Sequence, residues 1–346
     1  MNEESSQHSE HVSRLVLPAA DDLHVHVRQG ELMERVIPLL RAGGAGRCLV
    51  MPNTSPPTTS VDAACAYREA MKAIDPSVDY LMTLYLSKAL TRDEILKAAD
   101  AGITGVKLYP RGVTTHSDAG VDCLDVYAPV FAAMEEAGLV LEIHGECGSN
   151  PDDDLCVLNA ESAFLPQVAQ LHQSHPELRI VLEHVTTADA VALVSRLGDT
   201  VAATITVHHI DLTVDDWAGR NHNFCKPVAK YPSDRDALRR VIRDGHPRFF
   251  LGSDSAPHPR SAKECAEACA GIFTSALLLP YLADSFDALG CLSTLPDFAT
   301  KFGRQFYGLE PLEERVELVR TPCRVPDAYG DIVPYRAGET LGWSLA

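Results

Sequence analysis

The run DLHVHVR at residues 22–28 contains two histidines separated by one residue, with an arginine two residues further on. In an extended strand successive side chains point to opposite faces, so His24, His26 and Arg28 are expected on the same face. Two imidazoles at this spacing suit a borderline-soft divalent cation such as zinc, and a guanidinium is a planar fork that fits a carboxylate. The run therefore predicts a face that binds a metal and an anion together.

Ligand-type residues recur where later apolar runs end. These residues are Lys107, His144, His184 and Asp254, with His258 shortly after the last of them. A single histidine at a strand end is usually a structural residue. Packing alone gives no reason for such residues to recur at the same place in successive runs, so the repetition indicates a shared site.

Lys107 needs its own explanation, because a protonated ammonium has no lone pair to offer a metal. A carbamate formed from its nitrogen and carbon dioxide would be a bidentate anion able to bridge two metals about 3.5–4 Å apart. Pairing with Asp254, or direct contact with a substrate, is the alternative that the residues leave open.

Apolar, β-branched runs alternate with segments of helical period. We predict strands at residues 22–28, 47–52, 79–86, 104–109, 139–144, 179–184, 201–207 and 248–254. We predict helices at residues 62–74, 91–101, 126–137, 159–174, 187–197, 233–244 and 261–280. This order predicts an α/β fold of the parallel (β/α)8, or TIM, barrel type, with a binuclear metal site at the C-terminal mouth of the strands. An open doubly wound sheet is the alternative, but no GxGxxG follows the first strand.

The length of 346 residues fits one large domain. We expect residues 1–14 to be a polar extension and residues 15–346 to form a single barrel domain that includes the C-terminal segment. The net charge of -18 argues against nucleic acid and membranes as partners. No run approaches the ~20 apolar residues of a membrane span, and the N-terminus lacks an apolar signal core, so a cytoplasmic protein with reduced cysteines is expected. Cys265 and Cys269 lack a second pair at zinc spacing and are interpreted as buried thiols.

The motifs DLHVHVR, VMPNT, VKLYP, EIHGE, LEHVTT and GSDSAPH, in this order, resemble the dihydroorotase branch of the amidohydrolase superfamily in its free-standing bacterial and fungal form. The resemblance covers residues 15–344 and includes NFCKP at 223–227 and RQFYGL at 304–309, which are not general amidohydrolase features. It implies a homodimeric enzyme that interconverts N-carbamoyl-L-aspartate and L-dihydroorotate in pyrimidine biosynthesis.

The resemblance also implies a cofactor of two zinc ions per subunit, bridged by N6-carboxylated Lys107. The metal ligands would be His24, His26, Lys107, His144, His184 and Asp254. The first two histidines and the aspartate would bind one zinc, and the other two histidines the second. A hydroxide between the metals would attack the ring amide, and Asp254 would take its proton and pass it to the leaving ring nitrogen.

The substrate contacts that the resemblance implies are His26, Arg28, Asn53, His144, Lys226, His258 and Ala270. Arg28, Asn53 and His258 would hold the carboxylate, and backbone groups of Lys226 and Ala270 the amide edge of the ring. The side chain of Lys226 departs from the apolar residue usual in bacterial members. Thr114 and Thr115, on a polar loop with Gly112 as a hinge, would close over the substrate as a lid; an ordinary surface loop is the alternative.

Two other classes of function remain open. A dihydropyrimidinase-like or hydantoinase-like enzyme would share the metal centre, but would need a neutral pocket where Arg28 and Asn53 offer charge and polarity. A non-catalytic barrel subunit of a pyrimidine-pathway assembly would be expected to have lost metal ligands. His208 and His209 are interpreted as core or supporting residues and not as extra ligands.

Overall fold

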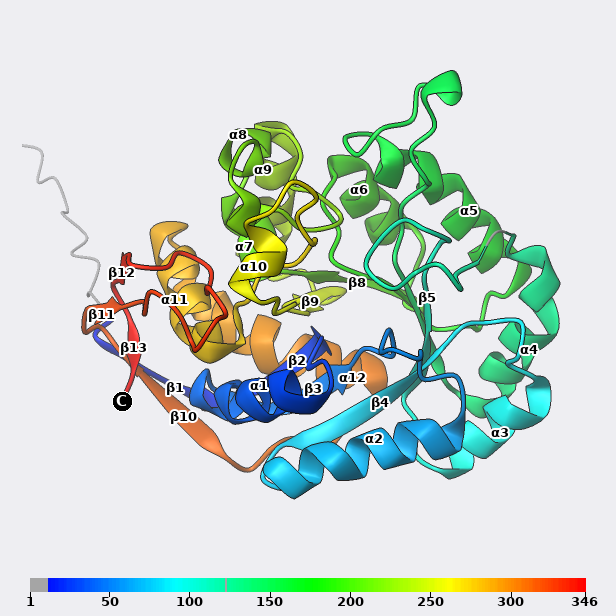
Figure 1. Ribbon diagram of the computed structural model, residues 1–346, viewed down its shortest axis with the longest axis horizontal. Coiled ribbons are helices and arrows are strands. Elements are labelled where there is room, and N and C mark those ends of the chain that lie inside the picture. Colours follow the sequence, from blue (N-terminus) through cyan, green and yellow to red (C-terminus); the bar gives the residue numbers. More distant parts are fainter. Residues whose placement is uncertain (1–11, 122) are drawn as a thin grey trace, which may run out of the picture.

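Eight parallel strands form one sheet in chain order, from β2 to β9, in the computed structural model, which describes residues 12–121 and 123–346. Their bounds are β2 Ala20–Val25, β3 Ala45–Val50, β4 Asp79–Tyr85, β5 Gly105–Leu108, β6 Val140–Ile143, β7 Ile180–Leu182, β8 Val201–Ile205 and β9 Phe249–Leu251. The sheet closes just beyond its last strand, where Val25 bridges Ser255 and the amide of Asp254 donates to His24 O over 2.9 Å. The predicted (β/α)8 barrel is confirmed (Figure 1).

Helices alternate with these strands, and α2 to α6 lie around the outside of the barrel in Figure 1. The longer helices are α1 Gly30–Ala42, α2 Val61–Ile74, α3 Arg92–Asp100, α4 Ala128–Ala137, α5 Ala160–Ser174, α6 Ala188–Arg196, α9 Pro232–Arg243 and α11 Leu278–Ala288. Shorter ones are α7 Val207–Asp211, α8 Val214–Trp217, α10 Arg260–Lys263 and α12 Phe302–Tyr307. In α9 the buried residues are Ala237, Leu238, Val241 and Ile242, an apolar stripe at helical spacing, whereas α11 is buried on most of its surface.

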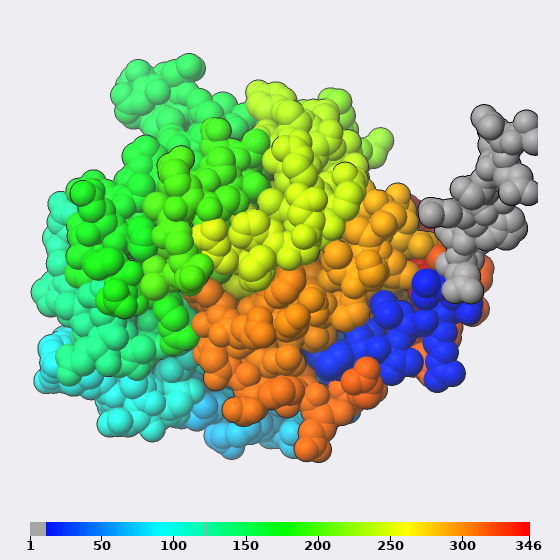
Figure 2. All heavy atoms as spheres, turned by 180° about the vertical axis from the view of Figure 1, so that it is seen from behind, coloured from blue at the N-terminus to red at the C-terminus, as the bar shows by residue number. Residues whose placement is uncertain are grey.

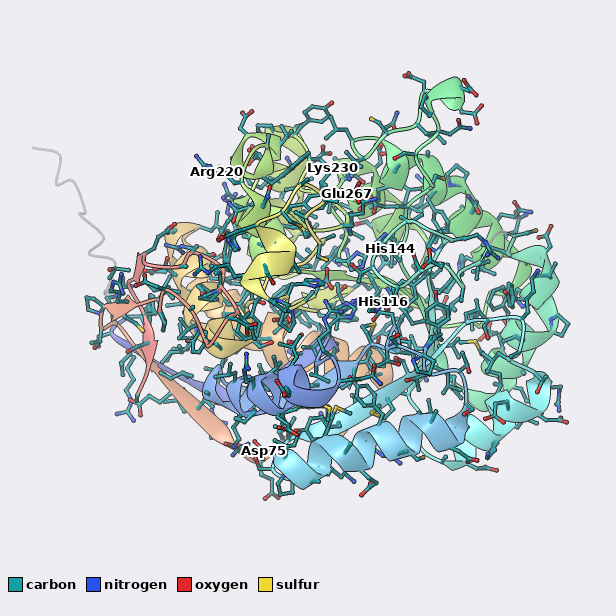
Figure 3. The ribbon with its side chains drawn as sticks, viewed as in Figure 1. Asp75, His116, His144, Arg220, Lys230 and Glu267 are labelled. Atoms are coloured by element: carbon teal, nitrogen blue, oxygen red, sulfur yellow. The ribbon has the colours of Figure 1, made fainter. Side chains whose placement is uncertain are left out.

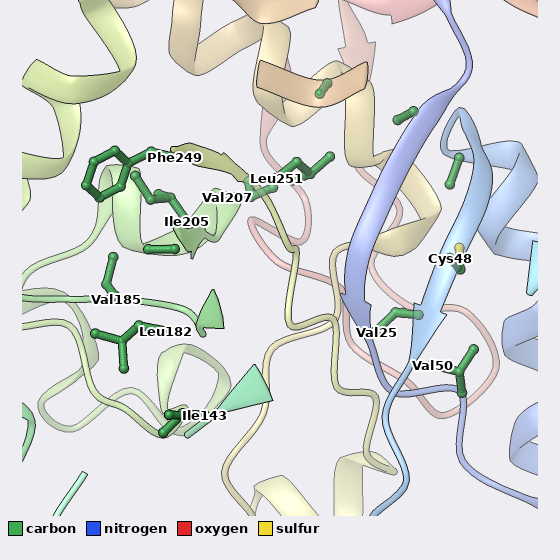
Figure 4. Close-up of a cluster of buried hydrophobic side chains, with 14 of the residues drawn as sticks. Val25, Cys48, Val50, Ile143, Leu182, Val185, Ile205, Val207, Phe249 and Leu251 are labelled. Atoms are coloured by element: carbon green, nitrogen blue, oxygen red, sulfur yellow. The ribbon is translucent and has the colours of Figure 1, made fainter. Parts of the chain in front are cut away.

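Strand alternation divides the core into two layers. Within β9, Phe250 belongs to a cluster inside the barrel with Leu23 and Val181, whereas Phe249 and Leu251 belong to the layer between strands and helices. Figure 4 shows part of that outer layer. The apolar cluster fills the barrel interior, so the polar residues at its mouth stand on a packed floor.

One predicted helix is wrong. Residues 261–280 form the short α10, then an irregular loop, and only afterwards α11. The cause is a tertiary contact, because the buried Nζ of Lys263 donates to the carbonyls of Phe224, Cys269 and Gly271 over 2.8, 3.0 and 2.7 Å. Those bonds hold the segment as a loop, and they leave Cys265 exposed and Cys269 half-buried, so the prediction of two buried thiols is wrong as well.

Helix α1 has no predicted counterpart. It contains Pro38, and two glycines follow it, which together weaken the helical pattern of residues 30–42. The helix forms nonetheless because Met33, Val36, Ile37 and Leu40 are buried against the barrel.

Both ends of the described chain meet in a small antiparallel sheet, ordered β1-β10-β13, with bounds β1 Arg14–Pro18, β10 Arg315–Val319 and β13 Ser344–Leu345. A further pair joins β11 Cys323–Arg324 to β12 Thr340–Leu341. Figure 2 shows the N-terminal segment packed beside the C-terminal one. Arg14 lies in β1, and residues 1–11 of the predicted extension are outside the described residues. Within the described part, no helix has the length and hydropathy needed to cross a membrane.

Candidate active site

The six predicted metal ligands come together at the C-terminal mouth of the barrel. They are His24 in β2, His26 just after it, Lys107 in β5, and His144, His184 and Asp254 just after β6, β7 and β9. None is more than 8% exposed. Side chains that are distant in sequence therefore come together, and all of them except Lys107 line one cavity.

The four imidazoles form a continuous row. Ring centroids are 5.4 Å apart for His26 and His24, and 5.0 Å apart for His24 and His184. The row continues to His144, 4.8 Å from His184. At the other end, Asp254 Oδ1 lies 3.0 Å from His26 Nε2 and 3.4 Å from His24 Nε2.

Burial sets the charge of these groups. Desolvation lowers the pKa of all four imidazoles, so they are neutral and each keeps a nitrogen lone pair. Desolvation acts to raise the pKa of Asp254, but the hydrogen bond from His26 and the electrostatic influence of His24, His26 and Lys107 outweigh it and lower the pKa to about 2. Neutral imidazoles beside an ionised carboxylate are the donor set that a divalent cation requires.

Lys107 lies beneath the row and is fully buried. Its Nζ is 5.1 Å from the centroid of the Tyr109 ring and has no hydrogen-bond partner among the described residues. Desolvation lowers its pKa to about 8, against the opposite influence of Glu183, Glu142 and Asp254. An unpaired buried polar group costs about 1–3 kcal/mol, so an orphaned nitrogen here fits a site that a bound group completes. The residues present therefore fit a metal centre.

Three site residues have left-handed backbones, with φ of 63° at Arg28, 41° at His184 and 47° at Asp254. Such conformations cost about 1–3 kcal/mol each and concentrate at functional sites. They also correct the prediction that strand alternation places Arg28, because β2 ends at Val25 and the chain then turns. His24, His26 and Arg28 nevertheless line the same cavity.

One end of the cavity carries the guanidinium of Arg28. Arg28 Nε donates to Pro257 O over 3.1 Å, and its Nη2 lies 3.0 Å from His258 Nε2. His258 Nε2 in turn lies 3.0 Å from Ala270 O. These contacts fix the direction of the guanidinium before any ligand arrives.

The cavity above the row has a free volume of about 20 Å³. It is lined by His24, His26, Arg28, Asn53, Tyr109, Thr114, Thr115, His144, His184, Lys226, Asp254, Ala256, Ala270 and Gly271. An adjoining cavity of about 320 Å³ shares Arg28, Asn53 and Thr115 with it and is also lined by His258. The smaller cavity has room for little more than one water molecule, so an organic substrate requires part of its lining to move.

The part best placed to move is the loop at residues 111–117, which covers the cavity with Thr114 and Thr115. Lys226 Nζ donates to Val113 O over 2.8 Å, and Asn53 Nδ2 donates to Thr115 O over 3.0 Å. The hydroxyl of Thr115 lies 3.4 Å from Ala270 O. His116, labelled in Figure 3, places its Nδ1 3.1 Å from Asn53 O. The loop therefore lies over the cavity and is held there by a few polar contacts.

The sequence of this chain is similar to those of known proteins. A family model described as amidohydrolase matches residues 53–202. A dihydroorotase of Mycosarcoma maydis is 43% identical over an alignment of 389 residues that covers 96% of this chain and 99% of that protein. A dihydroorotase of the bacterium Halorhodospira halophila is 45% identical over 345 residues, covering 96% and 98%. The chain belongs to the dihydroorotase family of amidohydrolases.

The fold agrees with that membership. A crystal structure of dihydroorotase from Saccharomyces cerevisiae in complex with 5-fluoroorotic acid matches with a TM-score of 0.94 at 41% identity, covering 97% of this chain and 99% of that one. A dihydroorotase-family enzyme is a metal-dependent cyclic amidohydrolase that acts on small molecules. The family therefore implies a metal cofactor for the row of imidazoles.

Sequence reasoning missed two buried carboxylates of this dihydroorotase-family site. Glu146 accepts a hydrogen bond from His144 Nε2 over 2.9 Å. Glu183 Oε2 lies 2.8 Å from His24 Nδ1, a close approach whose angle is unsuited to a hydrogen bond, and it accepts the hydroxyl of Thr204. Each of these glutamates lies within two residues of a predicted ligand in the sequence, and this closeness could have identified them as site residues.

His208 and His209 are buried outside the cavity. His209 Nδ1 lies 2.9 Å from Thr206 Oγ1, and its Nε2 lies 3.0 Å from Pro227 O. These contacts give His209 a structural role, whereas neither ring nitrogen of His208 has a hydrogen-bond partner among the described residues.

Proposed function

We propose that this protein is a dihydroorotase that reversibly interconverts N-carbamoyl-L-aspartate and L-dihydroorotate in pyrimidine biosynthesis. One observation carries the proposal: a buried row of neutral imidazoles with Asp254 opens into the same cavity as the anion anchor of Arg28. A cyclic amide that bears a carboxylate needs both features at once. The homologues named dihydroorotase, and the yeast structure with 5-fluoroorotic acid, support the same substrate class.

We propose two zinc ions per subunit. His24, His26 and Asp254 would hold one, and their ligand atoms lie within 4.8 Å of one another. His144 and His184 would hold the other, with carboxylated Lys107 as the bridge. The carboxylation adds carbon dioxide to the neutral lysine amine and releases one proton, so a lowered pKa favours it. When bound, the cations act as Lewis acids and activate a water molecule for attack on the ring amide.

The protein's own residues bind the substrate and move the proton. Arg28, Asn53 and His258 would hold the carboxylate, as a charge-assisted fork with two polar neighbours. Backbone groups of Lys226 and Ala270 would bond the amide edge of the ring, while His26 and His144 contact the reacting end. Asp254, ionised in its buried site, would accept the proton from the attacking water and pass it to the leaving ring nitrogen.

Thr114 and Thr115 would act from the lid. Closing the loop at residues 111–117 excludes bulk water and brings two hydroxyls over the substrate. The small volume of the cavity beneath the loop supports this role, because a substrate needs more room than the present lining leaves.

Arg28 separates this proposal from a hydrolase of neutral cyclic amides. Dihydrouracil and hydantoin lack a carboxylate, so they would leave the partly buried guanidinium of Arg28 without an anionic partner. A non-catalytic barrel is disfavoured because all six proposed ligands are present and buried, and five of them line one cavity.

We further propose that residues 15–346 act as one domain, that the enzyme is a homodimer, and that it works in the cytoplasm. The pairing of β1 with β10 and β13, which ties the two ends of the described chain together, supports the single domain. The ten free cysteines fit a reducing compartment.

The test is an assay of purified protein for ring opening of L-dihydroorotate, followed by loss of ultraviolet absorbance, with metal content measured on the same sample. We expect turnover with two zinc ions per subunit. Faster turnover of dihydrouracil or hydantoin would replace the proposal by a neutral-amide hydrolase. Absence of both turnover and stoichiometric metal would point to a scaffold.

A further inference from the structure

A buried acid–base pair stands behind His144. Glu146 Oε2 lies 2.9 Å from His144 Nε2, and Glu146 Oε1 lies 3.5 Å from Lys230 Nζ. The side chains of His144, Glu146 and Lys230 are 1%, 3% and 0% exposed. His144 and Lys230, both labelled in Figure 3, come from the end of β6 and from the loop before α9.

Burying two charges is unfavourable unless each finds partners, so the pair is not explained by stability alone. Lys230 Nζ meets part of that requirement by donating to Val157 O over 2.6 Å. The carboxylate of Glu146 meets it through the imidazole of His144. Glu146 is thus directed at a proposed metal ligand and not at solvent or another helix.

The contact fixes which nitrogen of His144 is available. A neutral imidazole has one N–H and one lone pair. A carboxylate 2.9 Å from Nε2 keeps the proton on Nε2, which leaves the lone pair on Nδ1. Carboxylates placed this way behind metal-binding histidines orient the ring and increase its basicity.

Lys230 ties this arrangement to the substrate end of the site. Lys230 is the last residue of the segment 224–230, and this segment also carries Lys226 on the cavity wall. The carbonyl of Lys230 accepts a hydrogen bond from Val214 N over 2.8 Å. Lys226 in turn contacts the lid at Val113. A short segment therefore connects the lid, the cavity wall and the carboxylate behind His144.

We propose that Glu146 and Lys230 are positioning residues for the metal that His144 binds. Glu146 holds His144 in the tautomer that presents Nδ1 to the metal centre, and Lys230 holds Glu146 in place. This inference rests on the proposed function, because it concerns the second metal of the proposed pair.

The experiment follows zinc release from the holoenzyme into a chromogenic chelator. We expect one of the two zinc equivalents to leave about 100-fold faster in Glu146→Leu and about tenfold faster in Glu146→Gln, which keeps an acceptor oxygen but loses the charge. The other equivalent should leave at the wild-type rate. Lys230→Met should resemble Glu146→Gln, because the carboxylate then loses its anchor.

The matched control is Glu135→Gln. Glu135 lies on α4, and its Oε2 is 3.1 Å from Nδ1 of His175, the residue after α5. Neither residue lines the cavity. We expect both zinc equivalents to leave this variant at wild-type rates.

The inference is overturned if folded Glu146→Gln and Lys230→Met release both zinc equivalents at the wild-type rate. These two conservative variants are sufficient for the test if Glu146→Leu does not fold. Equal acceleration of both equivalents would also overturn it, because that result describes general loosening. Wild-type protein with fewer than two zinc ions, or without dihydroorotate turnover, would instead refute the proposed function, which keeps the two failures distinct.

Discussion

Replacing Lys226 by methionine tests whether the loop at residues 111–117 is a lid. In the closed loop the ammonium of Lys226 donates to Val113 O over 2.8 Å. Methionine keeps an unbranched apolar chain of similar reach but has no donor. Backbone groups of residue 226 are unaffected, so any backbone contact with substrate should survive.

The expected size of the effect follows from the contact. A hydrogen bond from a charged donor contributes about 1.5–3 kcal/mol, and the partly exposed setting of this one favours the lower end. About 1.5 kcal/mol corresponds to roughly a tenfold shift from closed to open. The contact between Asn53 and Thr115 remains in the variant, so the loop should still close, but less often.

Two measurements read this shift. Trypsin cleavage after Arg111 should quicken about tenfold, because cleavage tracks the open population when opening is fast. Proline follows residue 226, so the substitution neither removes nor adds a tryptic site there. The value of kcat/KM for dihydroorotate should fall by up to the same factor.

Lys226→Arg is the control, since it retains a cation that can reach the same carbonyl. It should cleave and turn over within about threefold of wild type, well below the tenfold change expected from loss of the bond. If Lys226→Met matches wild type in both cleavage rate and kcat/KM, the contact to Val113 does not hold a lid and the reasoning fails.

Three other changes test the site. Asp254→Asn removes the proposed base, so turnover should fall about 10²–10⁴-fold with bound metal retained, as steady-state kinetics and metal analysis on one sample will show; more than a tenth of wild-type turnover would rule out this role. Lys107→Ala should lose metal and activity together, with partial recovery on adding a short carboxylic acid, and density for an unmodified Lys107 beside two fully occupied metals would contradict the bridge. Thr114→Val with Thr115→Val keeps the β-branched shape and should lower kcat about five- to 200-fold for each lost donor, at about 1–3 kcal/mol each, with a smaller change in KM; an unchanged kcat would leave an ordinary surface loop.

That the proposed ligands come together could be predicted from sequence because their signal is local. His144 and His184 each end a short apolar strand, and in a parallel barrel all strand ends of one kind meet at one mouth. The loop between α10 and α11 could not be predicted, because Lys263 holds it through the carbonyl of Gly271 in the loop itself and through that of Phe224 on a distant segment. Glu146 was missed for a related reason, since its role depends on the direction of one imidazole.

The turn at Arg28 shows a further limit. Period-two alternation correctly grouped Arg28 with His24 and His26, although the strand ends before the arginine is reached. Arg28 has a left-handed backbone conformation in place of the expected extended one, and its guanidinium lines the same cavity. The prediction that Arg28 lies with His24 and His26 was right, but strand alternation is not the reason, because an alternating sequence pattern does not show where the strand ends.

The proposed ligands of the first metal lie at the seam of the barrel, where its first and last strands meet. The sheet runs from β2 to β9, and contacts just beyond these two strands join its ends. Asp22 accepts from the amide and hydroxyl of Ser253 over 2.8 and 2.6 Å, and the amide of Asp254 donates to His24 O. The residues that close the barrel are therefore next to, or identical with, the proposed ligands of the first metal. A cation bound by His24 and Asp254 would bridge the same seam, and a ligand that binds only the closed form stabilises that form by mass action. Metal binding and barrel closure should accordingly reinforce each other, which gives a physical reason for placing these ligands on the first and last strands.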